Sequence, residues 1–179
     1  MSEDLDRRLR RIEDRLELLE LPARYARAID DRDIPALLDC FCVDGTFERI
    51  DGTHSFTGHA ALEAFWRDIL GGYGMSIHIP HAQVVDRIEG DAASGWVMSH
   101  AELAVGEQFV VGAFRYHDDY RRVDGRWRFR RRRLAFWYFT DWTELADTIP
   151  SLDRQRFRTA ARPADLPESL ESYREFVGR

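Results

Sequence analysis

Two histidines three residues apart stand out in the otherwise apolar stretch Ser76-Ile77-His78-Ile79-Pro80-His81. The stretch begins a predicted strand, whose core face should carry only apolar side chains. A polar side chain on that face costs free energy unless it has a hydrogen-bond partner. The best candidate partners are the carboxylates of Ala28-Ile29-Asp30-Asp31-Arg32-Asp33. We predict a buried His–Asp pair in an aromatic-lined pocket. The alternative is a core histidine bonded to a carbonyl group or a water molecule.

A histidine paired in this way is suited to proton abstraction. Imidazole accepts a proton near neutral pH, and a carboxylate on its second nitrogen fixes the tautomer and stabilises the imidazolium. His81 should face away from His78 because neighbouring positions of a strand alternate, which makes it the second candidate base. His54 falls in a turn and is expected to be exposed.

Aromatic residues make up 12% of the chain and are concentrated in its second half. Beside one buried acid–base pair, such an excess suits a flat hydrophobic substrate, and sheet core is the alternative role. His100 shares the parity of Trp96 and Met98 on one strand, so it is expected to face the same interior as that bulky pair, with a surface histidine as the alternative. The predicted substrate-binding residues are Trp96, Met98, Phe114, Phe136 and Trp137.

The chain offers little for a metal or a cofactor. His117-Asp118-Asp119 contains three possible ligands, but strand alternation divides them between two faces. Cys40 and Cys42 are too close for an ordinary disulfide, and no Cys or His cluster has zinc spacing. We expect no metal, no cofactor and a reducing, cytoplasmic setting.

The composition predicts a single domain and excludes some partners. The 179 residues can bury a substantial core, and the formal net charge of −6 disfavours a general nucleic-acid surface. No apolar run approaches the roughly 20 residues of a membrane span. The N-terminal stretch is charged and has no signal-peptide pattern, so no membrane partner is expected.

Hydrophobic periodicity predicts helices first and then a sheet. The stripe Leu5, Leu9, Ile12, Leu16 and Leu19 predicts a buried helix face within residues 4–32, with Pro22 starting a second segment. Further helices are predicted over residues 34–41 and 59–70, with a turn into a strand at 43–47. Strands follow at about 76–89, 92–105, 108–123 and 126–140, joined by hairpin turns. This order predicts an α+β fold.

A strongly curved antiparallel sheet wrapped on helices makes a cone with a deep interior. Residues 1–143 are expected to form this cone. Residues 144–179 are expected to be an extension that packs over its mouth or on a neighbouring subunit, with helical patterns at 152–160 and 169–177.

The order of elements resembles the SnoaL-like branch of the nuclear-transport-factor-2-like superfamily over roughly residues 5–142. Scytalone dehydratase, bile-acid 7α-dehydratase and hexachlorocyclohexane dehydrochlorinase are members, and all three are cofactor-free lyases with a His–Asp pair in the cone. The resemblance places that pair on Asp30 and His78. It also implies a homodimer or homotrimer formed through the outer sheet face.

The resemblance suggests roles for three more residues. Tyr25 falls on a tyrosine of the bile-acid enzyme and on a lysine of the dehydrochlorinase, which argues against halide elimination. His100 falls near a strand aspartate of the bile-acid enzyme. The run of arginines at 130–133 puts Arg132 on the catalytic arginine of the dehydrochlorinase. Strict alternation from Trp127 and Phe129 would point Arg131 and Arg133 inward, so an inward Arg132 requires a β-bulge.

These features together predict a cofactor-independent lyase. His78 would remove a proton, Asp30 would orient it, and Tyr25 or His100 would assist a leaving group in a dehydration or a loss of formaldehyde. Arg132 or a neighbour would stabilise an enolate or phenolate oxygen. The substrate would be a hydrophobic aromatic or polycyclic small molecule. An isomerase or cyclase of a polyketide or steroid is the alternative enzyme, and a ligand-binding or assembly subunit is the non-catalytic alternative.

Overall fold

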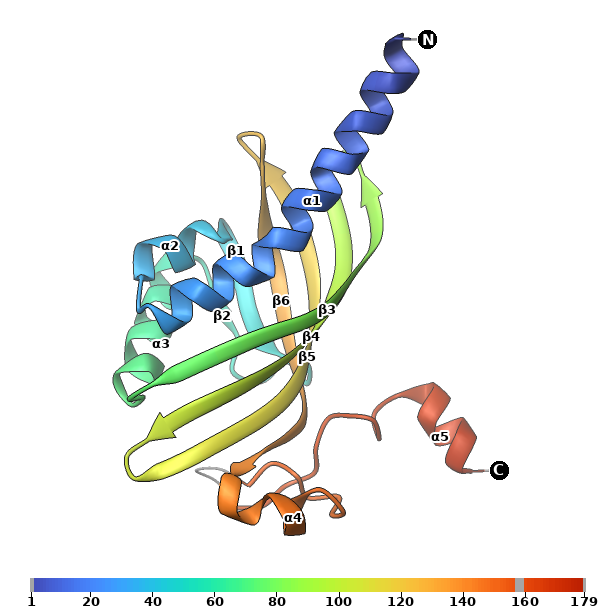
Figure 1. The fold of residues 1–179 in the computed structure, drawn as a ribbon. Coiled ribbons are helices and arrows are strands. Elements are labelled where there is room, and N and C mark those ends of the chain that lie inside the picture. The colour runs from blue at the N-terminus through green and yellow to red at the C-terminus, as the bar shows by residue number, and fades with distance from the viewer. Residues whose placement is uncertain (1, 157–159, 179) are drawn as a thin grey trace.

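The computed structural model describes residues 2–156 and 160–178, and within them a curved sheet wraps around three helices (Figure 1). The six strands are ordered β2-β1-β6-β5-β4-β3. The elements are α1 (Ser2–Asp30), α2 (Ile34–Asp39), β1 (Phe41–Arg49), β2 (Phe56–Thr57), α3 (His59–Gly71), β3 (Ser76–Glu89), β4 (Ala92–Val105), β5 (Gln108–Val123), β6 (Arg126–Asp141), a 3₁₀ turn (Trp142–Glu144), α4 (Leu145–Thr148) and α5 (Glu171–Val177).

The strands β3 to β6 form the predicted antiparallel meander, and their bounds match the predicted ones to within one residue. Residues with positive φ, among them Gly90, Gly106 and Gly125, make the hairpin turns, where a side chain would strain the backbone. The sheet is nevertheless mixed, because β1 pairs with β6 in parallel. The predicted α+β cone is confirmed, with the parallel edge as an addition.

The helix α1 is continuous, so the predicted break at Pro22 is wrong. Proline has no N–H, and Pro22 therefore leaves the carbonyl group of Leu18 without its helical partner. The side-chain amide of Gln83 on β3 supplies the missing donor, with 2.9 Å between Nε2 and the Leu18 oxygen. A residue of the sheet thus satisfies the proline site and ties α1 to β3.

The predicted apolar stripe of α1 is exposed, not buried. Leu5, Leu9, Ile12, Leu16 and Leu19 (the exposed stripe) are each 47–57% exposed. A second apolar face packs on the sheet instead, through Leu18, Leu21, Tyr25, Ala28 and Ile29. The prediction failed because α1 is apolar on two faces, and periodicity alone does not show which face meets the sheet.

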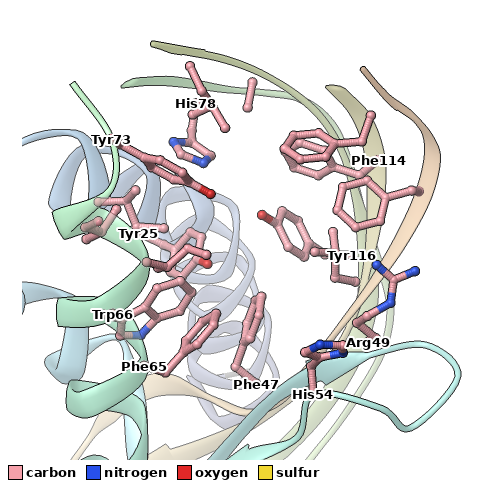
Figure 2. Close-up of a pocket in the computed structure, with 18 of the residues that line it drawn as sticks. Tyr25, Phe47, Arg49, His54, Phe65, Trp66, Tyr73, His78, Phe114 and Tyr116 are labelled. Atoms are coloured by element: carbon pink, nitrogen blue, oxygen red, sulfur yellow. The ribbon is translucent and has the colours of Figure 1, made fainter. Parts of the chain in front are cut away.

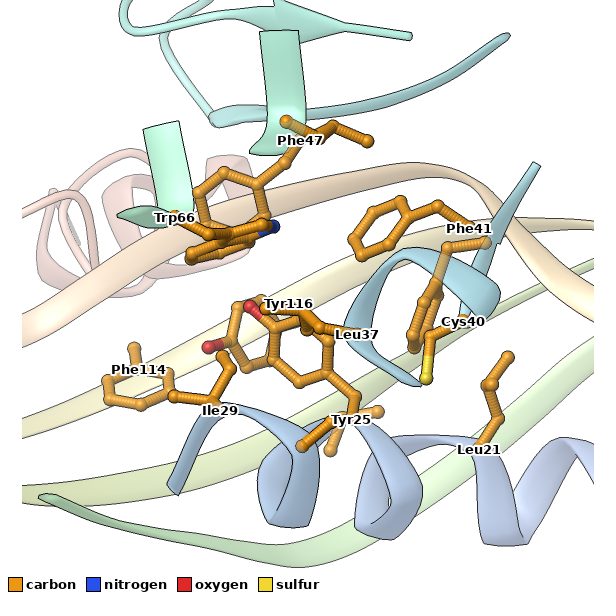
Figure 3. Close-up of a cluster of buried hydrophobic side chains, with 14 of the residues drawn as sticks. Leu21, Tyr25, Ile29, Leu37, Cys40, Phe41, Phe47, Trp66, Phe114 and Tyr116 are labelled. Atoms are coloured by element: carbon orange, nitrogen blue, oxygen red, sulfur yellow. The ribbon is translucent and has the colours of Figure 1, made fainter. Parts of the chain in front are cut away.

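The core lies between α1, α2, α3 and the concave face of the sheet (Figure 3). Tyr25 lies at its centre and makes edge contacts with Phe41, Trp66, Tyr116 and Phe129, at 5.8–6.1 Å between ring centroids. The free cysteines Cys40 and Cys42 are also buried. Burial raises the pKa of the Cys40 thiol to about 11 and also raises that of Cys42.

The chain after β6 folds back along that strand. Phe139 exchanges backbone hydrogen bonds with Arg154 and Arg156, each 2.8 Å long, and the backbone N–H of Leu166 donates to Phe136 at 3.0 Å. The helix predicted over 152–160 is wrong for residues 152–156, and residues 157–159 lie outside the described part. The second predicted helix is present as α5. The assignment of 144–179 as an extension of one domain stays a prediction.

Within residues 2–156 and 160–178, no helix has the length and apolar character that crossing a bilayer requires.

Candidate active site

A cavity of about 230 Å³ lies between α1, α3 and the concave face of the sheet (Figure 2). Its wall is mostly aromatic and aliphatic, with Phe65 and Trp66 from α3 facing Phe114 and Phe136 from the sheet. Polar side chains lie at its two ends. The labelled view shows His78 and Tyr73 at one end, and Arg49 and His54 at the other. Arg162, from the segment after β6, also lines this cavity.

His78 and Asp30 form the predicted pair. The distance between His78 Nδ1 and Asp30 Oδ1 is 2.7 Å, although 48 residues separate the two in sequence. The backbone N–H of His78 donates to Asp30 Oδ2 at 2.8 Å, and the Ser76 hydroxyl donates to Asp30 Oδ1 at 3.0 Å. If Nδ1–H donates to the carboxylate, Nε2 keeps the lone pair, so the ring can act as a base toward the cavity that it lines.

The secondary structure explains why the pair meets. Asp30 is the last residue of α1, while Ser76 and His78 occupy alternate positions at the start of β3 and therefore share a face. Arg32, whose backbone φ is +60°, links the end of α1 to the start of β3. Its guanidinium donates to the Ile29 carbonyl, the Ser76 hydroxyl and the Gly74 carbonyl at 2.6–2.9 Å. Sequence reasoning missed this positioning role of Arg32.

Asp30 is held as a carboxylate. Burial opposes its charge, but the hydrogen bonds from the side chain and backbone of His78, with that from Ser76, outweigh the burial and lower the pKa of Asp30. A charged Asp30 beside Nδ1 holds the imidazole in one orientation and would stabilise an imidazolium formed during a reaction.

Tyr25 reaches the cavity together with Tyr116, a residue of β5 that sequence reasoning missed. Burial raises the pKa of Tyr25 well above its usual value and that of Tyr116 to about 12. Both groups are therefore hydroxyl donors at neutral pH. The rings of Tyr25 and Tyr116 make an edge contact, with 6.1 Å between their centroids. Tyr116 has the same parity as Phe114, and that signal could have identified it.

Arg132 faces inward but lies behind the cavity wall. Asp119 pairs with Arg131 and Tyr120 with Phe129, so Arg130 is an extra residue in β6. This is the bulge that an inward Arg132 requires, and it is present. The guanidinium carbon of Arg132 stacks 3.8 Å from the Tyr116 ring centroid and 4.3 Å from that of Tyr25. The predicted direct contact with a substrate oxygen is therefore corrected, because two tyrosines separate Arg132 from the cavity.

Three residues of β4 face outward, against expectation. Trp96, Met98 and His100 alternate with the inward and buried Val97, Ser99 and Ala101. The concave side of a curved sheet packed on α1 has little room, so small side chains occupy it and bulky ones point away. His100 bonds to His81 on the outer face, at 2.6 Å between ring nitrogens. The predicted assistance from His100 is overturned by this orientation.

Trp137 also lies outside the cavity. Ala113 pairs with Tyr138 and Phe114 with Phe136, so Trp137 is the extra residue of a second bulge in β6. On the outer face, the guanidinium carbon of Arg115 lies 5.5 Å from the Trp96 ring centroid and 5.7 Å from that of Trp137. Of the five predicted lining residues, Phe114 and Phe136 border the cavity, and their role in substrate binding stays a prediction.

In the part of the chain that the structure describes, no three His, Cys, Asp or Glu side chains gather closely enough to hold a metal ion. The two faces of β5 separate the acidic residues of His117-Asp118-Asp119. Asp118 is buried against Arg132, whereas Asp119 pairs with Arg133 near the surface.

A sequence profile of the SnoaL-like domain matches residues 10–133, about two thirds of the chain. The chain belongs to the SnoaL-like domain family. Asp30, His78 and the bulge at Arg130 all lie inside the matched residues. No curated protein sequence matches it.

Solved structures give the same fold, that of the nuclear-transport-factor-2-like superfamily. An NTF2-like protein with a cystatin-like fold from Novosphingobium aromaticivorans is 31% identical, with a TM-score of 0.62 over 75% of this chain and 89% of the other. The hexachlorocyclohexane dehydrochlorinase LinA-type3 from Novosphingobium barchaimii is 20% identical, with a TM-score of 0.68 over 76% and 95%. A provisionally named scytalone dehydratase from Novosphingobium aromaticivorans is 18% identical, with a TM-score of 0.70 over 86% and 94%. At these lower identities the last two likenesses show the fold alone.

Proposed function

We propose that this SnoaL-like protein is a cofactor-independent lyase that eliminates water from a compact aromatic or hydroaromatic molecule. The observation that carries the proposal is that His78 lines an apolar cavity while its Nδ1 contacts Asp30. A base whose second nitrogen is fixed by a carboxylate is the arrangement that abstracts a proton next to an activating group. The dehydratase and dehydrochlorinase names among the structural neighbours agree with an elimination.

The proposed reaction uses three side chains. His78 Nε2 takes a proton from carbon, and the electron pair of that C–H bond forms the new double bond while the neighbouring C–O bond breaks. The leaving oxygen departs as water with the proton of the hydroxyl of Tyr116, which also lines the cavity. Proton transfer from His78 to the phenolate, directly or through water, then restores both residues. Asp30 stabilises the imidazolium in between.

The cavity limits the size of the substrate. Its volume of about 230 Å³ exceeds the roughly 150 Å³ of a cavity that holds benzene. It falls below the roughly 300–1,000 Å³ typical of drug-sized ligands. A substituted one-ring or two-ring molecule therefore fits better than a four-ring steroid. Arg49, His54 and Arg162 would face an oxygen-rich or acidic substituent at the end away from His78.

A mass-resolved screen tests the function. The protein is incubated with cyclic and benzylic alcohols and diols, with and without a carboxylate, and products are identified by mass spectrometry in ordinary and in deuterated water. Loss of water is the expected result. Loss of formaldehyde, or deuterium uptake without loss of a group, would replace the proposal by a retro-aldol lyase or an isomerase. Binding without conversion of any compound would favour the non-catalytic alternative.

A further inference from the structure

The N-terminal half of α1 projects beyond the sheet (Figure 1). Residues 3–13 are all exposed, which amounts to three helical turns. Isolated helices shorter than about 12–15 residues are marginal in water, because tertiary packing supplies most helix stability. The exposed stripe is therefore an apolar surface on a helix whose N-terminal turns would be stabilised by packing against another surface.

The spacing of the exposed stripe is that of a coiled-coil seam. The steps from Leu5 to Leu9, Ile12, Leu16 and Leu19 are four, three, four and three residues. An alternation of threes and fours places Leu9 and Leu16 at a positions of a heptad, and Leu5, Ile12 and Leu19 at d positions. This narrow seam differs from the face of α1 that packs on the sheet. The helix therefore has two separate apolar faces.

The charged residues beside the seam indicate which partner helix it binds. The e positions are Asp6, Glu13 and Glu20, all acidic, and the g positions are Arg8 and Arg15, both basic. In a parallel coiled coil each g residue meets the e residue of the following heptad in the partner helix, which brings Arg8 to Glu13 and Arg15 to Glu20. In an antiparallel pair g meets g and e meets e, so like charges would face each other. Charge complementarity therefore selects a second copy of the same helix in parallel orientation.

We propose that α1 joins copies of this chain through a parallel coiled coil along the exposed stripe. The contact is separate from the outer sheet face. It needs no coupled folding of the whole helix, because residues 14–30 already pack on the sheet and extend α1 toward its partner. Leucine at both a positions with isoleucine at the central d position favours more than two strands.

The mass in solution tests the contact. Sedimentation or light scattering across a wide concentration range should show an oligomer for the wild type. Leu9→Gln with Leu16→Gln should reduce its mass, while the melting temperature of the cone persists at low concentration. The control is Val43→Gln, which removes an apolar side chain that is 76% exposed on another surface and should leave the mass unchanged. A monomeric wild type, or an unchanged mass in the double variant, would overturn the proposal.

A charge swap tests the orientation. Arg8→Glu with Arg15→Glu makes every e and g position acidic and should weaken association. Adding Glu13→Arg and Glu20→Arg restores opposite charges in a parallel pair and returns the net charge to that of the wild type, so the fourfold variant should recover the wild-type mass. In an antiparallel contact the double variant would only replace like positive charges by like negative charges at the g positions, so its association should not weaken. Equal association of all three proteins would show that these charges play no part and would also overturn the parallel assignment.

Discussion

Two side-chain pairs in this protein each contain a carboxylate but have different surroundings. His78–Asp30 and Arg132–Asp118 each join a nitrogen base to a carboxylate, at 2.7 and 3.2 Å. The first pair keeps some exposure, 13% and 21% of the two side chains, and borders the cavity. The second is sealed, at 1% and 0%, behind the rings of Tyr25 and Tyr116. Access to a cavity, rather than burial of charge, distinguishes the candidate catalytic pair.

The two carboxylates also differ in how their charge is stabilised. Hydrogen bonds from His78 and Ser76 outweigh the burial of Asp30 and lower its pKa. At Asp118 burial dominates over the attraction of Arg132 and raises the pKa to about 6. The sealed pair also leaves Asp118 Oδ1 and Arg132 Nε and Nη1 without hydrogen-bond partners among the described residues. The Arg132–Asp118 pair fixes the position of Tyr25 and Tyr116 at a cost in stability. Asp30, in contrast, stays charged beside the candidate base His78.

Removal of the His78 side chain should have the largest effect on turnover. His78→Ala is expected to lower turnover of a substrate found in the screen by roughly 10²–10⁴-fold, the usual contribution of a general base. The fold should persist, because Ser76 and the backbone N–H of residue 78 still bond Asp30. Steady-state kinetics with His81→Ala as the matched control measures this. A folded His78→Ala protein with wild-type turnover would remove the pair from the mechanism.

Disruption of the Arg132–Asp118 pair should lower the stability of the fold. Asp118→Asn leaves Arg132 as an uncompensated buried cation and should cost about 3–5 kcal/mol in the free energy of unfolding. Denaturant titration measures the loss. Asp119→Asn is the matched control, because its pair with Arg133 has the same 3.2 Å separation nearer the surface. The control should cost less than about 1 kcal/mol. Equal losses in the two variants would contradict the distinction.

Gln83, which bonds the Leu18 carbonyl at the Pro22 site, should contribute less to stability than Asp118. Gln83→Met removes a donor from both the Leu18 carbonyl and the Tyr120 hydroxyl, and Tyr120 in turn donates to Asp118. Unsatisfied buried acceptors predict a loss of about 1–3 kcal/mol by denaturant titration. Pro22→Ala returns an N–H to the Leu18 carbonyl. In the Gln83→Met background it should recover part of the loss, and no recovery would mean that the Leu18 bond contributes little.

The pH dependence of stability should have opposite signs at the two carboxylates. The stability from Asp30 is present above its unfolded pKa, roughly 3.9, and is lost as the pH falls through its lower folded pKa. Asp118 contributes most below that unfolded value, and its contribution is lost as the pH rises through about 6. The difference in melting temperature between wild type and Asp118→Asn should therefore shrink as the pH rises from 4.5 to 7.5. The difference between wild type and Asp30→Asn should instead shrink as the pH falls below about 4. Parallel trends would contradict this assignment.

The sequence predicted those features that local patterns determine. Alternation and turn residues predicted the four long strands. Two polar residues in apolar segments, together with the family resemblance, predicted the contact of His78 with Asp30. Packing decided what local patterns left open. Parity grouped Trp96, Met98 and His100 correctly but could not show which face of β4 is concave. The bulge at Arg130 was required by the resemblance, whereas the bulge at Trp137 had no local signal. Tyr116 became significant only when Tyr25 was found beside it.

The buried thiols have a practical consequence for spectroscopy. Cys40 and Cys42 are the two cysteines of the chain, both enclosed by the core and both with raised pKa values, so neither presents a reactive thiolate at neutral pH. Maleimide dyes or nitroxide labels should therefore attach selectively to a cysteine introduced on the surface. The native chain can thus serve without prior cysteine removal as a background for distance measurements by electron spin resonance or energy transfer.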